Sequence, residues 1–258
     1  MSRTIAIVNQ KGGVGKSTTA VNLGACLGAA GLRTLLVDLD PQANATSGLG
    51  IARDRQSSTI YDVLLNGAGV ESIIVPAAAP GLDVAPSTIH LAGAEVELAG
   101  AEGAEHRLSR ALAGINYEIV LLDCPPSLGL LTVNALTAAT EVLIPLQCEY
   151  YALEGLKQLL HSVELVRRHL NPALEIGGVL LTMFDSRTNL SDQVAAEVRR
   201  FFGEQVFETI IPRSVRLAEA PSYGKPITAY DPGSRGALAY RALAQEVIAR
   251  GRHPTPTG

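Results

Sequence analysis

Apolar runs and amphipathic stretches alternate along the 258-residue chain. Strands are predicted at the apolar runs 4–8, 34–38, 82–85, 118–122, 142–146, 176–182 and 206–211. Several of these runs are too apolar for a sheet that leaves one face in water. Uninterrupted apolar runs are typical of parallel strands that are covered on both faces.

Apolar residues at helical spacing lie mostly between these runs, near 17–30, 88–98, 104–113, 129–138, 152–170, 189–202 and 235–250. A shorter helix is predicted at 59–65 and a turn at 77–81. Strands that alternate with helices imply right-handed crossovers and predict an α/β fold, a doubly wound and mostly parallel sheet flanked by helices. We expect a single domain over residues 1–250, followed by a disordered tail at 251–258.

A glycine-rich segment links the first predicted strand to the first predicted helix. It reads Lys11-Gly12-Gly13-Val14-Gly15-Lys16-Ser17-Thr18. Its glycines let backbone N–H groups converge on phosphates, and the helix N-terminus adds its positive dipole end. Lys16 would reach the β- and γ-phosphates, and the Ser17 hydroxyl would hold Mg²⁺. The common P-loop pattern has a glycine where this chain has Gln10, and a second lysine, Lys11, follows at the far end of the loop.

Carboxylates follow two other predicted strands. Asp38 and Asp40 come at the end of the second strand, and Asp123 ends the fourth apolar run, at the Walker B position. Ligands of open α/β sheets bind at the carboxyl ends of the strands, so the loop, these carboxylates and Pro212 should converge there. Asp123 would hold Ser17 or a metal-bound water. The alternative for Asp38 and Asp40 is that they only cap the next segment.

Composition narrows the classes of function. The net charge of −4 argues against a nucleic-acid binder, so any DNA contact requires a local surface, such as one assembled by two subunits. No apolar run approaches the roughly 18 residues of a membrane span, and the N-terminus is too polar for a signal peptide. Cys26, Cys124 and Cys148 have no metal-ligand spacing and fit buried, reduced thiols. A cytoplasmic protein is expected.

Three segments together resemble the ParA/MinD group of P-loop ATPases with a deviant Walker A motif. They are the loop at 11–18 and two segments like the switch regions of that group, VDLDPQ at 37–42 and DCPPS at 123–127. The stretch PRSVRLAEAPS at 212–222 more narrowly resembles the chromosomal ParA proteins, also called Soj, which act in DNA segregation. The likeness extends from about Thr4 to about Ala249. It implies a slow, Mg²⁺-dependent ATPase that partitions chromosomes or plasmids.

The resemblance also implies roles for single residues around ATP. Asp40 would position the attacking water, and Asp38 would support Mg²⁺. Lys11 would cross a dimer interface to the nucleotide of the partner; the alternative is a solvated loop lysine. The adenine-side candidates are Pro212 and Arg213, and Glu149 would approach the ribose across the dimer.

Arg187 and Arg216 match positions at which Soj-like proteins contact the DNA backbone, and the alternative is ordinary surface arginines. The implied protein is an ATP-bound homodimer in the cytoplasm, associated with the nucleoid through non-specific binding of double-stranded DNA. Hydrolysis, stimulated by a ParB-type protein, would release it. Because the first strand begins by Thr4, we expect no separate N-terminal DNA-reading domain.

Three other classes of protein compete with this reading. A MinD-type membrane-associated cell-division regulator needs a C-terminal amphipathic helix, yet here the last predicted helix is followed by Pro254-Thr255-Pro256. We therefore expect no stable membrane association. An electron-transfer ATPase of the nitrogenase iron protein type needs cluster cysteines, and Cys124 and Cys148 do not fall at such positions. A metabolic ligase of related fold is the remaining alternative.

Overall fold

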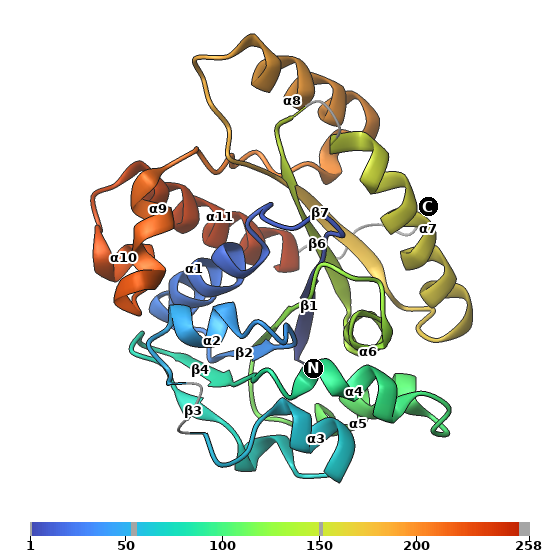
Figure 1. Cartoon of the computed structure of the whole chain (residues 1–258). Helices are drawn as coiled ribbons and strands as arrows, with labels where there is room; N and C mark the ends of the chain where they lie inside the picture. Colours follow the sequence, from blue (N-terminus) through green and yellow to red (C-terminus); the bar gives the residue numbers. More distant parts are fainter. Residues whose placement is uncertain (1, 53–55, 150–151, 253–258) are drawn as a thin grey trace.

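Seven strands form one sheet in the computed structural model, which describes residues 2–52, 56–149 and 152–252 (Figure 1). The strands are β1 (Arg3–Ile7), β2 (Thr34–Asp38), β3 (Val75–Pro76), β4 (Leu82–Ala85), β5 (Ile119–Asp123), β6 (Glu141–Gln147) and β7 (Glu175–Thr182). Their spatial order is β3-β4-β2-β5-β1-β6-β7, and all pairs are parallel except β3 with β4. The predicted mostly parallel α/β sheet is confirmed.

Helices cover both faces of this sheet. They are α1 (Lys16–Ala29), α2 (Asn44–Gly48), α3 (Ile60–Asn66), α4 (Leu91–Leu98), α5 (Arg107–Ala111), α6 (Leu130–Ala138), α7 (Ala152–His169), α8 (Asn189–Phe202), α9 (Val215–Glu219), α10 (Ile227–Tyr230) and α11 (Arg235–Arg252). Short 3-10 turns are η2 (Val70–Ser72), η3 (Ala104–His106), η4 (Gly203–Gln205) and η5 (Ala220–Tyr223). The helix predicted at 104–113 is divided into η3 and α5. The short helices α2, α9 and α10 were not predicted.

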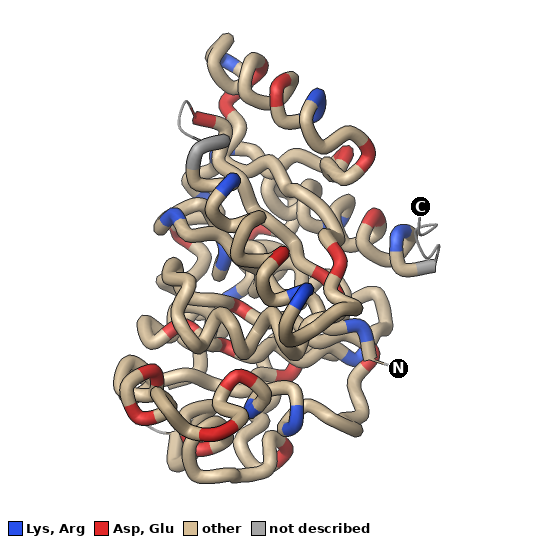
Figure 2. The backbone as a smooth tube through the Cα atoms, turned by 90° about the vertical axis from the view of Figure 1, so that its right-hand side faces the viewer, with Lys and Arg blue, Asp and Glu red and all other residues tan. Residues whose placement is uncertain are grey.

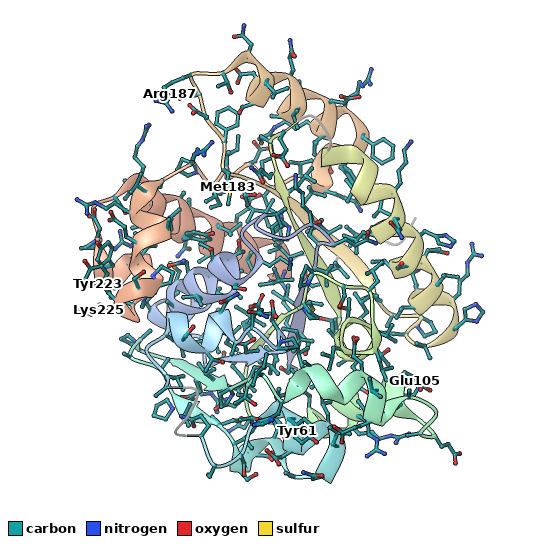
Figure 3. The ribbon with its side chains drawn as sticks, viewed as in Figure 1. Tyr61, Glu105, Met183, Arg187, Tyr223 and Lys225 are labelled. Atoms are coloured by element: carbon teal, nitrogen blue, oxygen red, sulfur yellow. The ribbon has the colours of Figure 1, made fainter. Side chains whose placement is uncertain are left out.

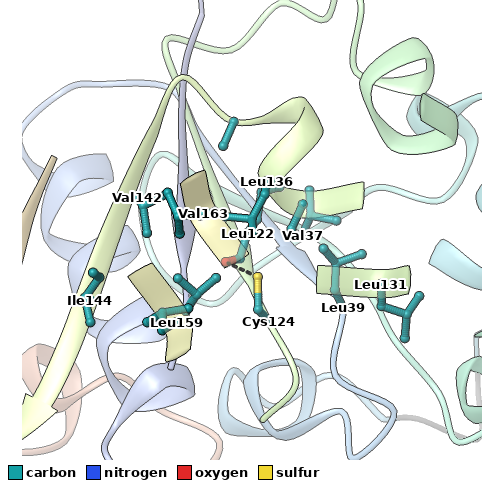
Figure 4. Close-up of a cluster of buried hydrophobic side chains, with 14 of the residues drawn as sticks. Val37, Leu39, Leu122, Cys124, Leu131, Leu136, Val142, Ile144, Leu159 and Val163 are labelled. Carbon is teal, nitrogen blue, oxygen red and sulfur yellow. Dashed lines mark hydrogen bonds between the residues drawn. The ribbon is translucent and has the colours of Figure 1, made fainter. Parts of the chain in front are cut away.

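Successive residues of the central strands alternate between two apolar cores. Ile5 and Ile7 of β1 pack in one core with α1 and α11, whereas Ala6 packs in the other core with helices α3 to α8. Figure 4 shows part of this second core, in which Leu122 and Cys124 lie among aliphatic side chains. Because both faces of the sheet are covered, its strands are apolar along their whole length.

The strand predicted at 206–211 is wrong. This segment lies alongside β7 but pairs with it and the residues after it only through isolated bridges at its two ends. Val206 pairs with Val179, and Pro212, the next residue after the segment, pairs with Phe184. Between the bridges, the amides of Glu208 and Thr209 donate to the Glu246 carboxylate of α11, at 2.8 and 3.0 Å. The ladder to β7 is interrupted because α11 takes these donors. A carboxylate from a distant helix is invisible in a local apolar pattern.

The C-terminal helix is longer than predicted. Helix α11 continues to Arg252, so the predicted disordered tail is wrong at residues 251 and 252. The rest of that predicted tail, 253–258, lies outside the described residues. Among the helices that the structure describes, none combines the length and the apolar character of a membrane span.

Candidate active site

The loop between β1 and α1 is held by hydrogen bonds to β6 and β7. Asn9 Nδ2 donates to Pro145 O at 2.7 Å, and its Oδ1 accepts from the amide of Lys11 at 2.9 Å. Farther along the loop, Thr182 Oγ1 at the end of β7 donates to Val14 O at 2.9 Å. These bonds fix both halves of the loop above the carboxyl edge of the sheet. Sequence reasoning missed Thr182, although its place at a strand end next to the loop was a usable signal.

The backbone of the loop leaves donors free for an anion. Gly13 and Gly15 have φ angles of 75° and 91°, in the left-handed region that favours glycine. Gly15 is also the N-cap of α1, and no side chain caps that helix. The N–H groups of an uncapped first turn, together with the helix dipole, form an anion-binding site. The loop therefore has the donors that a phosphate cradle requires.

Lys16 points back into its own loop. Its side chain is buried, with 7% of the residue exposed, and Nζ donates to Lys11 O at 3.1 Å. Burial lowers the pKa of Lys16, while the nearby groups of Asp123, Cys124 and Asp40 act in the opposite direction. A buried ammonium beside carboxylates and uncapped amides would interact strongly with a phosphate, because the surroundings screen it little.

Strand register brings the predicted carboxylates together. Asp38 at the end of β2 lies opposite Asp123 at the end of β5, and Asp123 also lies opposite Ile7 of β1, next to the loop. Both aspartates are fully buried. The convergence expected from topology is therefore present for these residues.

Asp123 has the character of a metal-site ligand. Neither of its buried carboxylate oxygens has a hydrogen-bond partner among the described residues. Burial raises its pKa well above the usual range, and the Asp38 carboxylate adds to this, whereas the Ser17 hydroxyl and the Lys16 ammonium oppose it. An unpartnered buried carboxylate beside a hydroxyl fits a hard cation such as Mg²⁺, which prefers oxygen ligands. Within the described ranges, no group of three or more His, Cys, Asp or Glu forms a metal site by itself.

Asp38 uses both carboxylate oxygens within its own chain. Oδ2 accepts from the amide and the hydroxyl of Thr46 at 2.8 and 2.7 Å, and Oδ1 accepts from the Asp40 amide at 3.1 Å. Burial raises the pKa of Asp38 to about 6, and the Thr46 bonds limit the rise. These contacts match the alternative in which Asp38 organises the next segment, and its support of Mg²⁺ stays a prediction. Asp40 accepts from the Gln42 amide at 2.9 Å.

Lys11 and Glu149 form an ion pair within one chain. Both side chains are partly exposed, at 48% and 33%. We predicted that each would reach a nucleotide across a dimer, and the sequence offered no signal that they pair with each other. The pair places the second lysine outside the phosphate cradle, with Glu149 beside it at the end of β6. Their predicted roles in a dimer stay predictions.

Two neighbouring cavities meet at the loop. One, of about 450 Å³, is lined by Lys16, Ser17 and Asp40, together with residues of α2 and η5. The other, of about 400 Å³, is lined by Pro212 and Arg213 and by residues of α9. Shared lining residues, which join the two spaces, are Gly15, Thr18 and Met183.

A nucleotide could place its phosphates in the first cavity and its base in the second. This arrangement is compatible with the prediction that Pro212 and Arg213 lie at the base, which stays a prediction. Sequence reasoning missed Met183, whose φ of 50° is unusual for a residue with a side chain. Figure 3 shows Met183 nearer to the middle of the molecule than Arg187, which projects at the periphery.

The two predicted DNA-contacting arginines lie outside the cavities. Arg187 stands in the loop between β7 and α8, with 84% of its side chain exposed. Arg216 lies in α9, with 58% exposed. Lys and Arg are interspersed with Asp and Glu along the chain (Figure 2).

The three cysteines are free and buried, as predicted. The Cys124 thiol donates to Leu122 O at 3.7 Å within the apolar core (Figure 4). Burial raises the pKa of Cys124 well above its usual range, which disfavours the reactive thiolate. Cys124 packs as a small hydrophobic residue.

Comparison with known proteins decides the family. Residues 2–176 match the model of a family described as AAA domain. The sporulation initiation inhibitor protein Soj of Bacillus subtilis is 60% identical over 253 residues, covering 97% of this chain and all of that protein. The chain belongs to the ParA/Soj family of chromosome-partitioning ATPases.

A second curated relative agrees with this assignment. The chromosome-partitioning ATPase Soj of Treponema pallidum is 52% identical, covering 97% of this chain and 98% of that protein. A crystal structure that carries a different name, cobyrinic acid a,c-diamide synthase from Mycobacterium smegmatis, shares the fold: it is 38% identical with a TM-score of 0.86, covering 98% of this chain and 96% of that chain. That structure contains an ATP analogue and magnesium. As a ParA/Soj member, this chain is an ATPase of chromosome partitioning.

Proposed function

We propose that residues 1–250 act as one ATP-driven switch whose ATP-bound homodimer binds DNA without sequence preference. The observation that carries this proposal is the loop itself. One lysine, Lys16, is buried in an uncapped phosphate cradle, and a second, Lys11, is half-exposed at the opposite end of the same loop. The second lysine lies outside the cradle, which supports a role in binding another subunit's nucleotide.

Each group around the cradle has its own role in ATP hydrolysis. Phosphoryl transfer is catalysed mainly by positioning and by stabilising charge. Ser17 and Asp123 would hold Mg²⁺, with Asp38 behind them, and the ion when bound would neutralise charge on the phosphates. Lys16 binds the phosphates, and Asp40 orients the attacking water from the wall of the same cavity.

The dimer is supported by the open face of the loop. A Cβ added to Gly12 would have no heavy atom within 4 Å among the described residues other than its two chain neighbours. The described part of one protomer therefore does not require glycine at position 12, whereas a partner or a nucleotide pressed against the loop would. In the dimer, Lys11 leaves Glu149 of its own chain and reaches the partner's nucleotide, so that ATP holds the two subunits together.

This dimer is tested by sizing chromatography with and without ATP. Lys16→Ala should lose nucleotide binding. Lys11→Ala and Gly12→Val should keep ATP binding and lose the ATP-dependent dimer. Gly233→Val is a matched control for Gly12→Val, since a Cβ at Gly233 also meets open space and neither glycine has a left-handed φ. A Lys11→Ala protein that dimerises like the parent would refute the role of Lys11 in trans.

DNA binding in the proposed cycle requires two subunits. One protomer offers Arg187 and Arg216, so about two phosphate contacts give a log–log salt slope of roughly −1.8. Two protomers give about four contacts and a slope of roughly −3.6. Contacts to the backbone carry no base information, so sequence preference should be slight. A ParB-type protein would stimulate hydrolysis and release the cytoplasmic ATPase from the nucleoid.

The DNA surface is tested by salt titrations of binding with ATP and with ADP. Arg187→Ala and Arg216→Ala should each weaken binding to unrelated sequences and leave the ATP-dependent dimer intact. Equal affinity in the two nucleotide states, or variants that bind as tightly as the parent, would show that DNA is bound elsewhere or not at all.

A further inference from the structure

Arg187 is already occupied by a carboxylate of its own chain. Its Nε donates to Asp185 Oδ1 at 2.8 Å and its Nη2 donates to Asp185 Oδ2 at 2.7 Å. The amide of Arg187 donates to the same carboxylate at 3.1 Å. A fork-like pair of this kind uses the two parallel donors with which arginine also binds a phosphate.

Arg216 is paired with two carboxylates, through one hydrogen bond and one longer ion-pair contact. Its Nη1 donates to Glu219 Oε2 at 3.1 Å, and its Nε lies 3.6 Å from Asp231 Oδ2. Glu219 is held in place because the Tyr230 hydroxyl donates to its Oε2 at 3.1 Å. Tyr230 in turn stacks on Tyr223, with ring centroids 4.9 Å apart. The partner of Arg216 is thus fixed by a small network.

These pairs cancel the charge of the proposed DNA surface. Asp185 balances Arg187, and Glu219 and Asp231 together exceed the charge of Arg216 by one. Each arginine is nevertheless largely exposed, so a phosphate can approach it. Ion pairs with an exposed arginine are screened by water, so a stronger anion can displace the carboxylate; the two-point pair with Asp185, whose side chain is only 18% exposed, is the stronger of the two pairings.

We propose that Asp185, Glu219 and Asp231 mask the two arginines, so that a DNA phosphate must displace a carboxylate of the same chain before it binds. The inference rests on the proposed DNA surface and deepens it. The mask lowers the affinity of a single protomer below the level at which it would stay on DNA. Only the joined arginines of two protomers then overcome the competition, which sharpens the dependence of DNA binding on ATP.

The primary test is Asp185→Asn, in which the amide oxygen can still accept from the Arg187 backbone while the charge is lost. DNA binding is measured by fluorescence anisotropy on a labelled duplex of random sequence, with a non-hydrolysable ATP analogue. We expect binding about two- to fivefold tighter, the range that exposed ion pairs span. Glu219→Gln, which keeps an acceptor for Tyr230, should give a similar gain through Arg216.

Asp192→Asn is the matched control. Asp192 is an exposed residue of the same segment, in the first turn of α8, and it has no ion pair among the described residues. Its neutralisation changes the net charge equally, so it should tighten binding less than Asp185→Asn does. In an Arg187→Ala background, Asp185→Asn should increase the affinity for DNA no more than the Asp192→Asn control does.

The outcomes separate the two proposals. If Arg187→Ala and Arg216→Ala leave DNA binding unchanged, the proposed DNA surface fails. If those variants weaken binding but Asp185→Asn and Glu219→Gln are no tighter than Asp192→Asn, the surface stands and the mask is overturned. Weaker binding by Asp185→Asn would also overturn the mask, because Asp185 would then position Arg187 for DNA.

Discussion

Thr46→Val tests how the buried carboxylate of Asp38 is tolerated. Valine keeps the shape of threonine but removes a hydroxyl that donates to Asp38 Oδ2 at 2.7 Å and accepts from the Ser87 amide at 3.1 Å. A hydrogen bond to a charged group contributes about 1.5–3 kcal/mol, and a buried amide left unpaired costs about 1–3 kcal/mol. At pH 8 the free energy of unfolding should therefore fall by about 2.5–6 kcal/mol, the sum of the two contributions.

The loss should also depend on pH, with a definite sign. The folded-state pKa of Asp38, about 6, lies above its ordinary value of 3.8. Protonated Asp38 therefore favours the fold, and this stability is present below about pH 3.8 and is lost as pH rises through about 6. Without the Thr46 hydroxyl the folded-state pKa rises further, so the loss becomes larger and extends to higher pH. At pH 5 the deficit of Thr46→Val should be about 1 kcal/mol smaller than at pH 8, because a neutral bond contributes only about 0.5–1.5 kcal/mol.

Urea unfolding at pH 5 and pH 8, followed by circular dichroism in nucleotide-free protein, measures both quantities. Thr137→Val is the control, since its hydroxyl donates to the neutral carbonyl of Val133 at 2.8 Å and should give a deficit that is independent of pH. A Thr46→Val deficit that is equal at the two pH values would refute the reasoning, because it would mean that Asp38 does not ionise in this range.

Three further predictions concern the core, the thiols and catalysis. Gly28→Ala should destabilise the protein by a few kcal/mol, since its Cβ would lie 2.4 Å from Pro80 O. Gly155→Ala, in open space on α7, should stabilise the protein by up to about 1 kcal/mol. Urea unfolding of both variants measures these changes. Burial raises the pKa of Cys26 and Cys148 to about 11. A thiol reagent at pH 8 should therefore label the native protein slowly and the denatured protein quickly. Fast labelling of the native protein would contradict the burial of these thiols. Asp40→Ala should still bind ATP yet release phosphate about a hundredfold more slowly or worse; near-normal turnover would remove Asp40 from the mechanism.

Much of the fold could be predicted from local patterns, because a strand covered on both faces must be apolar throughout and this chain alternates such strands with helices. The pattern failed where a distant residue decided the outcome, as with Glu246 and the segment 206–211. It also failed for helices α2, α9 and α10, which are only four or five residues long and too short to show a period.

The part of the candidate site that strand order determines could be predicted from the sequence. Strand ends place Asp38, Asp123 and the loop together, whichever side chains surround them. The partners of those side chains could not be predicted. Thr46 lies eight residues from Asp38, and Glu149 lies on another strand from Lys11, so both contacts depend on the packed structure.

The bond between Lys16 Nζ and Lys11 O has a consequence for the whole molecule. It gives the buried ammonium a hydrogen-bond partner inside its own loop. A ligand that binds only the folded chain then adds stability by mass action, about 1.4 kcal/mol for each tenfold rise in its concentration above the dissociation constant. The melting temperature of the protein should therefore rise with the concentration of nucleotide, so thermal unfolding reports the occupancy of the nucleotide site.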